Sequence, residues 1–225
     1  MLKVVMGQRL LKANEQVVRE NRNRLEAAGT FVVNLVSSPG AGKTALLEQT
    51  LGRLQGKYKM GVIEGDIYTT RDAERIARQG VAVVQINTAG VCHLDAPMVA
   101  RALEELDQGP YDLLFIENVG NLVCPAEFDL GEDVKVAVLS VTEGGDKPAK
   151  YPLVFRQASA VVINKSDLLP YTDFDLEAVK NELRAVNPGI RILLVSAKHG
   201  DGIEEWCGWL EGLILRKRAA RSAAE

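Results

Sequence analysis

Three side chains that suit a soft metal ion lie in the middle of this 225-residue chain. Cys92 and His93 are adjacent in VCHLDA, and Cys124 follows in NLVCP. Thiolate and imidazole ligands favour Zn²⁺ or Ni²⁺ over Mg²⁺ or Ca²⁺. Three protein ligands are one fewer than a closed zinc site requires, so a water, a substrate group or a second copy of the site would complete the shell. The alternative is that both cysteines are small buried apolar side chains.

A second group of residues predicts phosphate binding. SSPGAGKT, residues 37–44, follows an apolar run and precedes a helical pattern, which is the context of a phosphate-binding loop. Ser37 replaces the first glycine of that pattern. Backbone N–H groups would surround the phosphates, Lys43 would neutralise them and Thr44 would offer a hydroxyl to Mg²⁺. The predicted contacts of this loop are Gly40, Ala41, Gly42, Lys43, Thr44 and Ala45.

Two further loops predict that the base is guanine. NKSD, residues 164–167, resembles the N-K-x-D motif of GTPases, and SAK follows the last predicted strand. The Asp167 carboxylate can accept from guanine N1–H and the 2-amino group, a pair of donors that adenine lacks. Asn164 would bridge loops, Lys165 would lie across the ring and Ala197 would donate its N–H to guanine O6. The predicted base site comprises Asn164, Lys165, Asp167, Ser196, Ala197 and Lys198.

Carboxylates follow two predicted strands near the phosphates. EGDIYTTRDAER brings Glu64, Asp66 and Asp72 to this side, and Glu117 begins ENVGN, where most GTPases carry D-x-x-G. Asp66 and Glu117 would bind Mg²⁺ or orient the attacking water, or else cap a helix or loop. Lys147, in GGDKPAK, either reaches the nucleotide of a partner chain or is a solvated loop lysine. The predicted catalytic residues are Lys43, Asp66, Glu117 and Lys147, and the predicted magnesium ligands are Thr44, Asp66 and Glu117.

The elements that must position these residues alternate between short apolar runs and helical stretches. Strands that are apolar on both faces and separated by helices predict an α/β fold with a mostly parallel, doubly wound sheet of about seven strands. Ligands should bind at the carboxyl ends of these strands. The expected strands are 30–36, 59–65, 81–87, 111–117, 134–141, 158–164 and 191–197. The expected helices are 8–28, 43–55, 70–79, 94–107, 175–186 and 203–217.

One domain with short flanking segments is expected. Residues 1–29 would form a helical segment packed on the domain, residues 30–217 the P-loop GTPase domain with the metal site, and residues 218–225 a solvated basic tail. Cys207 lies in an amphipathic helical pattern and is expected in the core, whereas His199 is expected to face solvent. The apolar stripe of the N-terminal helix is Leu10, Leu11, Val17, Val18 and Leu25.

Composition limits the class of protein. The formal net charge of −3 argues against a general nucleic-acid binder, because such proteins neutralise phosphates with a basic face. An odd number of widely spaced cysteines suits reduced thiols. The N-terminal residues lack the apolar run of a signal peptide, and no run approaches the length of a membrane span. A cytoplasmic protein with no nucleic-acid partner and no membrane partner is expected.

The strings SSPGAGKT, EGDIYTTRDAERI, CHLDA, ENVGNLVCP, TEGGDKPAKYP and NKSDLLPY together resemble the hydrogenase nickel-incorporation GTPases, the HypB family, over residues 8–215. The resemblance implies a SIMIBI-class GTPase that uses GTP/GDP and Mg²⁺ and forms a homodimer when GTP binds. It implies nickel delivery to the [NiFe]-hydrogenase large subunit precursor, together with a HypA-type metallochaperone. It also implies a metal site for Ni²⁺ or Zn²⁺ at Cys92, His93 and Cys124. No arginine finger is evident, so intrinsic hydrolysis should be slow.

The chain also departs from parts of that family. Some members carry a cysteine-rich N-terminal nickel motif or a histidine-rich stretch, and neither occurs here, so nickel storage is not expected. Two alternatives stay open. One is a urease-accessory-type nickel GTPase, which usually has Cys-Pro-His where this chain has Cys92 and His93. The other is a regulatory GTPase with a structural zinc ion, which would stay bound regardless of the nucleotide.

Overall fold

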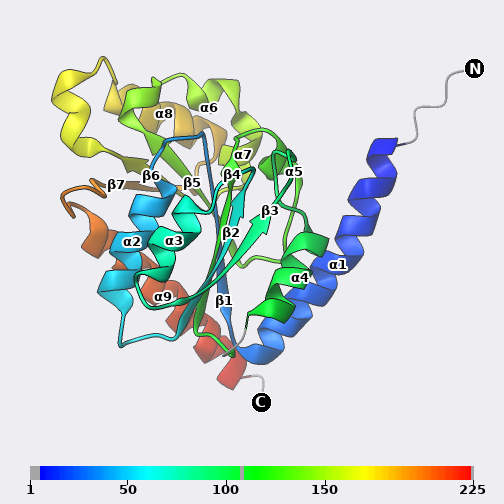
Figure 1. The fold of residues 1–225 in the computed structure, drawn as a ribbon. Coiled ribbons are helices and arrows are strands. Elements are labelled where there is room, and N and C mark those ends of the chain that lie inside the picture. The colour runs from blue at the N-terminus through cyan, green and yellow to red at the C-terminus, as the bar shows by residue number, and fades with distance from the viewer. Residues whose placement is uncertain (1–5, 107–108, 224–225) are drawn as a thin grey trace, which may run out of the picture.

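Seven parallel strands form the central sheet of the computed structural model, which describes residues 6–106 and 109–223, with side chains from residue 14 onward (Figure 1). Their order across the sheet is β3-β2-β4-β1-β5-β6-β7. The predicted parallel α/β architecture is therefore confirmed. The strands are β1 (Phe31–Ser37), β2 (Met60–Asp66), β3 (Ala82–Asn87), β4 (Leu113–Gly120), β5 (Val134–Ser140), β6 (Ala160–Asn164) and β7 (Arg191–Leu194).

Helices connect the strands, and three of them were not predicted. The short helices α5, α6 and α7 each carry proline in their first turn, a position where its missing N–H costs nothing. None of the helices in the described ranges combines the length and apolar character needed to cross a membrane. The helices are α1 (Met6–Ala28), α2 (Lys43–Leu54), α3 (Arg71–Ala77), α4 (Ala96–Glu105), α5 (Cys124–Glu127), α6 (Lys147–Lys150), α7 (Pro152–Gln157), α8 (Leu176–Val186) and α9 (Ile203–Ser222).

Helices cover both faces of the sheet. Successive residues of a strand point to opposite sides, so each strand packs against helices on both faces. In the central strand β1, Val33 and Leu35 pack into the core beneath α2 and α9. Val32, which points the other way, packs with α1 and α4 on the opposite face (Figure 1). The edge strand β3 differs from the expected burial: each of its residues is only partly buried or exposed, because this strand has a single neighbour.

Helix α1 lies beside α4 and buries part of its predicted apolar stripe (Figure 1). Val18 and Leu25 are buried as predicted, and Val17 is half-buried. Leu10 and Leu11 lie outside the residues whose side chains are described. The rest of the buried face of α1 is formed by polar side chains.

Two buried asparagines fill the remaining positions of the α1 stripe. Asn14 accepts from the Ala96 N–H at 2.8 Å and donates to the Asp129 carbonyl at 2.9 Å. Asn21 donates to the Ala96 carbonyl at 3.0 Å and to the Leu130 carbonyl at 3.2 Å. Since buried amides need such partners, α1 is joined to the start of α4 by specific hydrogen bonds as well as by apolar contact.

Helix α9 continues to Ser222, so its predicted end at residue 217 is wrong. Lys217 donates to the Thr30 carbonyl at 2.8 Å, and Arg218 forms an ion pair with Asp112. These contacts tie the last turns of the helix to the domain. The apolar pattern of the sequence fades after residue 215, so it did not predict these last turns, which are stabilised by charged side chains.

Candidate functional site

The loop between β1 and α2 adopts a conformation that requires glycine. Gly40 and Gly42 have φ angles of 76° and 97°, and a Cβ on Gly42 would lie 2.4 Å from Nδ2 of Asn164. The Lys43 ammonium donates to Oγ of Ser37 at 2.9 Å. The serine that replaces the usual first glycine of the motif therefore holds the lysine of the same loop.

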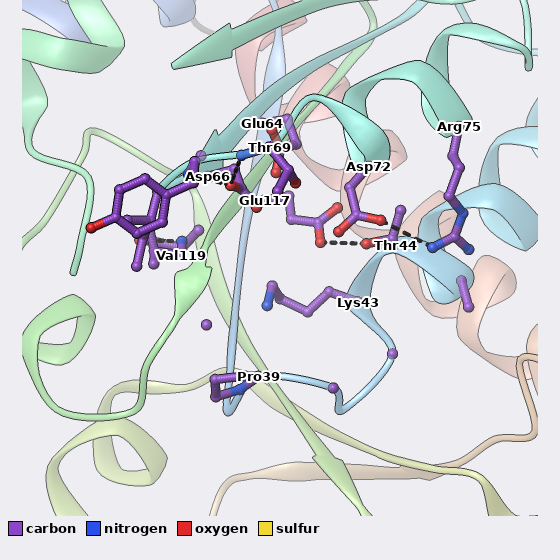
Figure 2. Close-up of a pocket in the computed structure, with 18 residues that line it drawn as sticks. Pro39, Lys43, Thr44, Glu64, Asp66, Thr69, Asp72, Arg75, Glu117 and Val119 are labelled. Carbon is purple, nitrogen blue, oxygen red and sulfur yellow. Dashed lines mark hydrogen bonds and ion pairs between the residues drawn. The ribbon is translucent and has the colours of Figure 1, made fainter. Parts of the chain in front are cut away.

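A cavity of about 540 Å³ lies between this loop, the ends of β2 and β4 and the start of α3. Figure 2 shows Lys43, Thr44 and Glu117 at its wall, with Glu64 and Asp66 above them. Ala41 is fully buried and does not line the cavity. The predicted phosphate contacts that do line it are Gly40, Gly42, Lys43, Thr44 and Ala45.

Glu117 faces the phosphate loop directly. Its Oε1 accepts from Oγ1 of Thr44 at 2.8 Å, while its Oε2 is buried without a hydrogen-bond partner among the described residues. Burial raises the pKa of Glu117 to about 7, although the nearby Lys43 ammonium favours the charged form. Oxygen-only donors with one unpartnered carboxylate oxygen fit a hard cation such as Mg²⁺.

Asp66 serves the loop that carries it. Its Oδ1 accepts from the N–H groups of Tyr68 and Thr69 at 2.7 and 2.6 Å. Carboxylate oxygens of Asp66, Glu64 and Asp72 also lie within 4.8 Å of one another. One carboxylate oxygen of Asp66 therefore accepts hydrogen bonds from its own loop, which is the alternative role considered for this residue. The group of Glu64, Asp66 and Asp72 still faces the cavity.

Glu64 is a buried acid to which the sequence assigned no role. It is 2% exposed, and its Oε2 has no hydrogen-bond partner in the described structure. Burial, followed by the neighbouring Glu117 carboxylate, raises the pKa of Glu64 to about 8. The nucleotide-free protein therefore keeps a proton on Glu64 at neutral pH.

The raised pKa of Glu64 predicts how stability depends on pH. Between pH 4.5 and about 8 the native state holds a proton that the unfolded chain has lost, so the free energy of unfolding falls as pH rises. Glu64→Gln removes this loss and should stabilise the nucleotide-free protein at pH 9 by roughly 5 kcal/mol, with little change at pH 5. Urea unfolding at pH 5 and at pH 9 measures this change in the free energy of unfolding. The exposed Glu182→Gln is the control, and equal pH dependence of Glu64→Gln and wild type would contradict the assignment.

Asn164 joins the phosphate loop to the loop after β7, as its predicted bridging position requires. Its Nδ2 donates to the Ala41 carbonyl at 2.9 Å, and its Oδ1 accepts from the Ala197 N–H at 3.0 Å. Lys165 donates to the Gly40 carbonyl at 2.8 Å. Because the Ala197 N–H is engaged by Asn164, a guanine O6 would have to share or displace that hydrogen bond.

Asp167 is held beside these residues. Its Oδ1 accepts from Oγ of Ser196 at 2.6 Å, and this hydrogen bond is the main reason that the pKa of Asp167 is lowered. Nε2 of His199 lies 3.7 Å from Oδ2, with the imidazole more than half exposed, as expected. Lys198 is exposed. An ionised acceptor is thus fixed at the edge of the candidate base site.

The three predicted soft-metal ligands come together. Sγ of Cys92 lies 3.1 Å from Sγ of Cys124 and 4.0 Å from Nδ1 of His93, and all three ligand atoms lie within 4.8 Å of one another. The described residues add no fourth cysteine, histidine or carboxylate to this group. Cys207 is buried elsewhere, as predicted, and burial raises its pKa to about 11. The cysteine-poor chain therefore concentrates two of its thiols at one point.

The surroundings of this metal cluster (Cys92, His93 and Cys124) hold its ligands in place. The His93 ring stacks on Phe128 with centroids 4.1 Å apart, and Asn121 donates to the Cys92 carbonyl at 3.3 Å. Burial lowers the pKa of His93, which favours the neutral imidazole that binds metals. Sequence reasoning missed Phe128 and Asn121, because only the fold brings them to the cluster.

Strand β4 connects the metal cluster to the cavity. Glu117 contacts the phosphate loop, and the next residue, Asn118, accepts from the Leu94 N–H at 3.1 Å on the other face of the sheet. The register between β1 and β4 shifts just after Glu117, a bulge of the kind found beside functional sites. Two consecutive residues therefore contact the two candidate sites.

Lys147 is not among the residues that line the nucleotide cavity. Its ammonium lies 5.6 Å from the centre of the Tyr151 ring. The structure of one chain thus gives it no role at its own nucleotide cavity. Its predicted reach to a partner chain stays a prediction.

Comparison with known proteins gives consistent matches. The family described as CobW/HypB/UreG, nucleotide-binding domain, matches residues 31–194. The hydrogenase maturation factor HypB of Azotobacter chroococcum mcd 1 is 54% identical over 221 residues, covering 98% of this chain and 71% of the relative. HypB from Archaeoglobus fulgidus superposes with a TM-score of 0.85 at 40% identity, covering 90% of this chain and 99% of that one. HypB from Helicobacter pylori, solved in complex with nickel, gives 0.85 at 39% identity, covering 92% and 96%.

Proposed function

The chain belongs to the HypB hydrogenase maturation factors of the CobW/HypB/UreG family, and we propose that it is a GTPase that delivers nickel to the [NiFe]-hydrogenase large subunit precursor. The observation that carries the proposal is a pair of consecutive residues in the second half of β4. Glu117 contacts the phosphate loop and Asn118 contacts the loop of the metal cluster. The relatives favour this branch over the urease-accessory alternative.

Guanine binding and phosphate binding are assigned to separate loops. Asp167 accepts from the guanine edge, with Asn164 and Lys165 holding the base loop against the phosphate loop. Lys43 neutralises the terminal phosphates, and the backbone N–H groups before it surround them. A chain that offers no evident arginine finger of its own should hydrolyse GTP slowly.

Magnesium fits the oxygen donors of the cavity. Thr44, Asp66 and Glu117 would hold it, and the unpartnered Oε2 of Glu117 supports this assignment. When bound, the ion would neutralise charge on the phosphate oxygens. Asp66 or Glu117 would in addition orient the attacking water, and the protonated Glu64 carboxyl behind them limits the negative charge of the cavity.

Nickel is the cargo, and the metal cluster is its proposed site. Two thiols and one imidazole suit Ni²⁺ or Zn²⁺, and the open position lets a ligand from water, substrate or a second chain complete the shell. The nickel complex of the Helicobacter pylori relative supports nickel here. A structural zinc ion is the competing occupant.

GTP binding should bring two copies together next to the metal cluster. Tyr68, Val91 and Val123 are 79%, 39% and 53% exposed, and Val91 and Val123 directly precede the two cysteine ligands. Tyr68 lies near Gly90, since a Cβ there would sit 3.9 Å from the tyrosine hydroxyl. Exposed apolar side chains around a functional site mark a protein-binding face. A second copy, a HypA-type metallochaperone and the hydrogenase precursor are the proposed partners.

Nickel titration in each nucleotide state tests the proposed function. The Ni²⁺ affinity of the wild-type protein should differ between the GDP state and a non-hydrolysable GTP state by roughly 5- to 150-fold, the usual range of coupling between two sites. By reciprocity, Ni²⁺ should change nucleotide affinity by the same factor. Identical nickel affinities in both states, for monomer and dimer alike, would reject the proposal, and a permanently bound Zn²⁺ would favour the structural role.

A further inference from the structure

A buried lysine lies behind the metal cluster, and neither nucleotide binding nor metal ligation uses it. The side chains of Lys135, in β5, and Glu132 are each 7% exposed, with Nζ 3.8 Å from Oε1. Taking two charges out of water costs several kcal/mol per ion, and apolar side chains of similar volume often stabilise a fold as well. Stability alone is therefore a weak reason for this pair.

The hydrogen bonds of Lys135 point to a different reason. Its ammonium donates to the carbonyls of Pro125 and Phe128 at 3.1 and 3.4 Å, which lie within and just after helix α5. A third hydrogen bond, 3.1 Å long, goes to Oε1 of Gln157 at the end of α7. Pro125 directly follows Cys124, and Phe128 is the residue that stacks on His93. One ammonium thus holds the backbone beside one metal ligand and the ring support of another.

Glu132 continues the connection through the sheet to the other ligand-bearing segment. Its Oε1 accepts from Nδ2 of Asn34 at 3.0 Å, and Oδ1 of Asn34 accepts from Nδ2 of Asn118 at 3.4 Å. Asn118 in turn accepts from the N–H of Leu94, the residue after His93. Asn34 and Asn118 are at most 1% exposed. Buried polar groups therefore link the two segments that supply the metal ligands.

We propose that Lys135 and Glu132 are positioning residues for the metal cluster, holding helix α5 and the loop of Cys92 and His93 at the spacing that nickel requires. The proposal rests on the proposed function of the cluster. Ligands that arrive from separate segments bind well only if those segments are fixed relative to one another. Losing outer partners of metal ligands typically costs 10–100-fold in affinity.

A charge-neutral double variant tests the proposal. Lys135→Met alone would leave the Glu132 carboxylate buried without its neighbouring cation, so Lys135→Met/Glu132→Gln is the informative change. Its Ni²⁺ affinity should fall about 10–100-fold and its thiolate-to-nickel absorption band should shift or weaken, with GDP affinity unchanged. Lys135→Arg, which can still donate to both carbonyls, should retain the wild-type band.

The matched control is a second lysine–carboxylate pair, Lys217 and Asp133. Lys217 donates to the Thr30 carbonyl and to Asp133 at 2.8 and 2.7 Å, and Lys217→Met/Asp133→Asn should leave nickel binding unchanged. A wild-type spectrum and affinity in the Lys135/Glu132 variant, or an equal loss in the control, would overturn the proposal. Asn34→Leu breaks the same connection midway and decides the question if the double variant does not fold. Failure of the wild type to bind Ni²⁺ would instead refute the proposed function.

Discussion

Asp167→Asn is expected to exchange the proposed guanine preference of this protein for a xanthine preference. The carboxylate would accept from two guanine donors, and each hydrogen bond to a charged group contributes about 1.5–3 kcal/mol. Losing this pair should weaken GTP and GDP binding by roughly 10²–10⁴-fold. Xanthine carries an oxygen where guanine carries the 2-amino group, so the asparagine amide can donate to it. Binding of fluorescent GDP and XDP analogues measures the exchange.

The Asp167→Asn substitution should leave the structure around residue 167 unchanged. The asparagine keeps an oxygen that can accept from Oγ of Ser196, so the loop should stay in place. Asp173→Asn, an exposed change six positions along the chain, is the control and should leave both affinities as they are. Equal losses of guanine and xanthine nucleotides would show that Asp167 does not read the base.

Cys92→Ala is expected to have the second large effect, the loss of high-affinity nickel binding. It removes a sulfur ligand that lies 3.1 Å from Sγ of Cys124 and 4.0 Å from Nδ1 of His93. A direct ligand should cost more than the 10–100-fold typical of an outer partner, so at least about 100-fold is expected. Ni²⁺ titration followed by thiolate-to-nickel absorption measures it.

Cys207→Ala provides the comparison for that variant. Cys207 is a buried thiol in α9, so its loss should cost some stability and leave nickel affinity unchanged. Nucleotide affinity measured without Ni²⁺ should be the same in both cysteine variants. Retention of wild-type nickel affinity in Cys92→Ala would remove the metal cluster from the proposed function.

The sites whose residues follow strands were predictable from the sequence. Parallel strands end at one edge of the sheet, so Cys92, which follows β3, and Asn164, which ends β6, could be assigned to that edge. Glu117 was expected to end its strand, but β4 continues to Gly120, so Glu117 lies just inside the same edge. The convergence of the three metal ligands is confirmed. Motif spacing carries this information because each motif is anchored to a strand that the apolar pattern reveals.

Polar groups inside the fold were not predictable in the same way. Asn34 lies in an apolar run and was expected only as part of a strand, yet it contacts Glu132 and Asn118, which are 98 and 84 positions away. Asn14 and Asn21 occupy a helix face where apolar residues were expected. In a sequence, such a residue is visible only as a polar residue at a position where the apolar pattern predicts the core. The apolar pattern does not identify its hydrogen-bond partner.

Short helices were missed for a different reason. Helix α5 spans four residues, which is too few to show a 3.6-residue period. The signal available was the proline that follows Cys124, since proline favours the first turn of a helix. The backbone geometry around the third metal ligand therefore came only from the structure.

The placement of Glu117 and Asn118 on opposite faces of the sheet has a consequence for metal selectivity. Side-chain oxygens line the cavity beside Glu117, whereas two thiols and an imidazole form a separate group next to the loop that Asn118 contacts. A hard ion gains little from the thiols, and a soft ion gains little from the carboxylates. The two groups of donors therefore suit different ions although they lie at the same edge of the sheet. Under the proposed function, the nucleotide with its Mg²⁺ and the nickel ion would each bind the donors that suit them, and the peptide bond between Glu117 and Asn118 would connect the two sites.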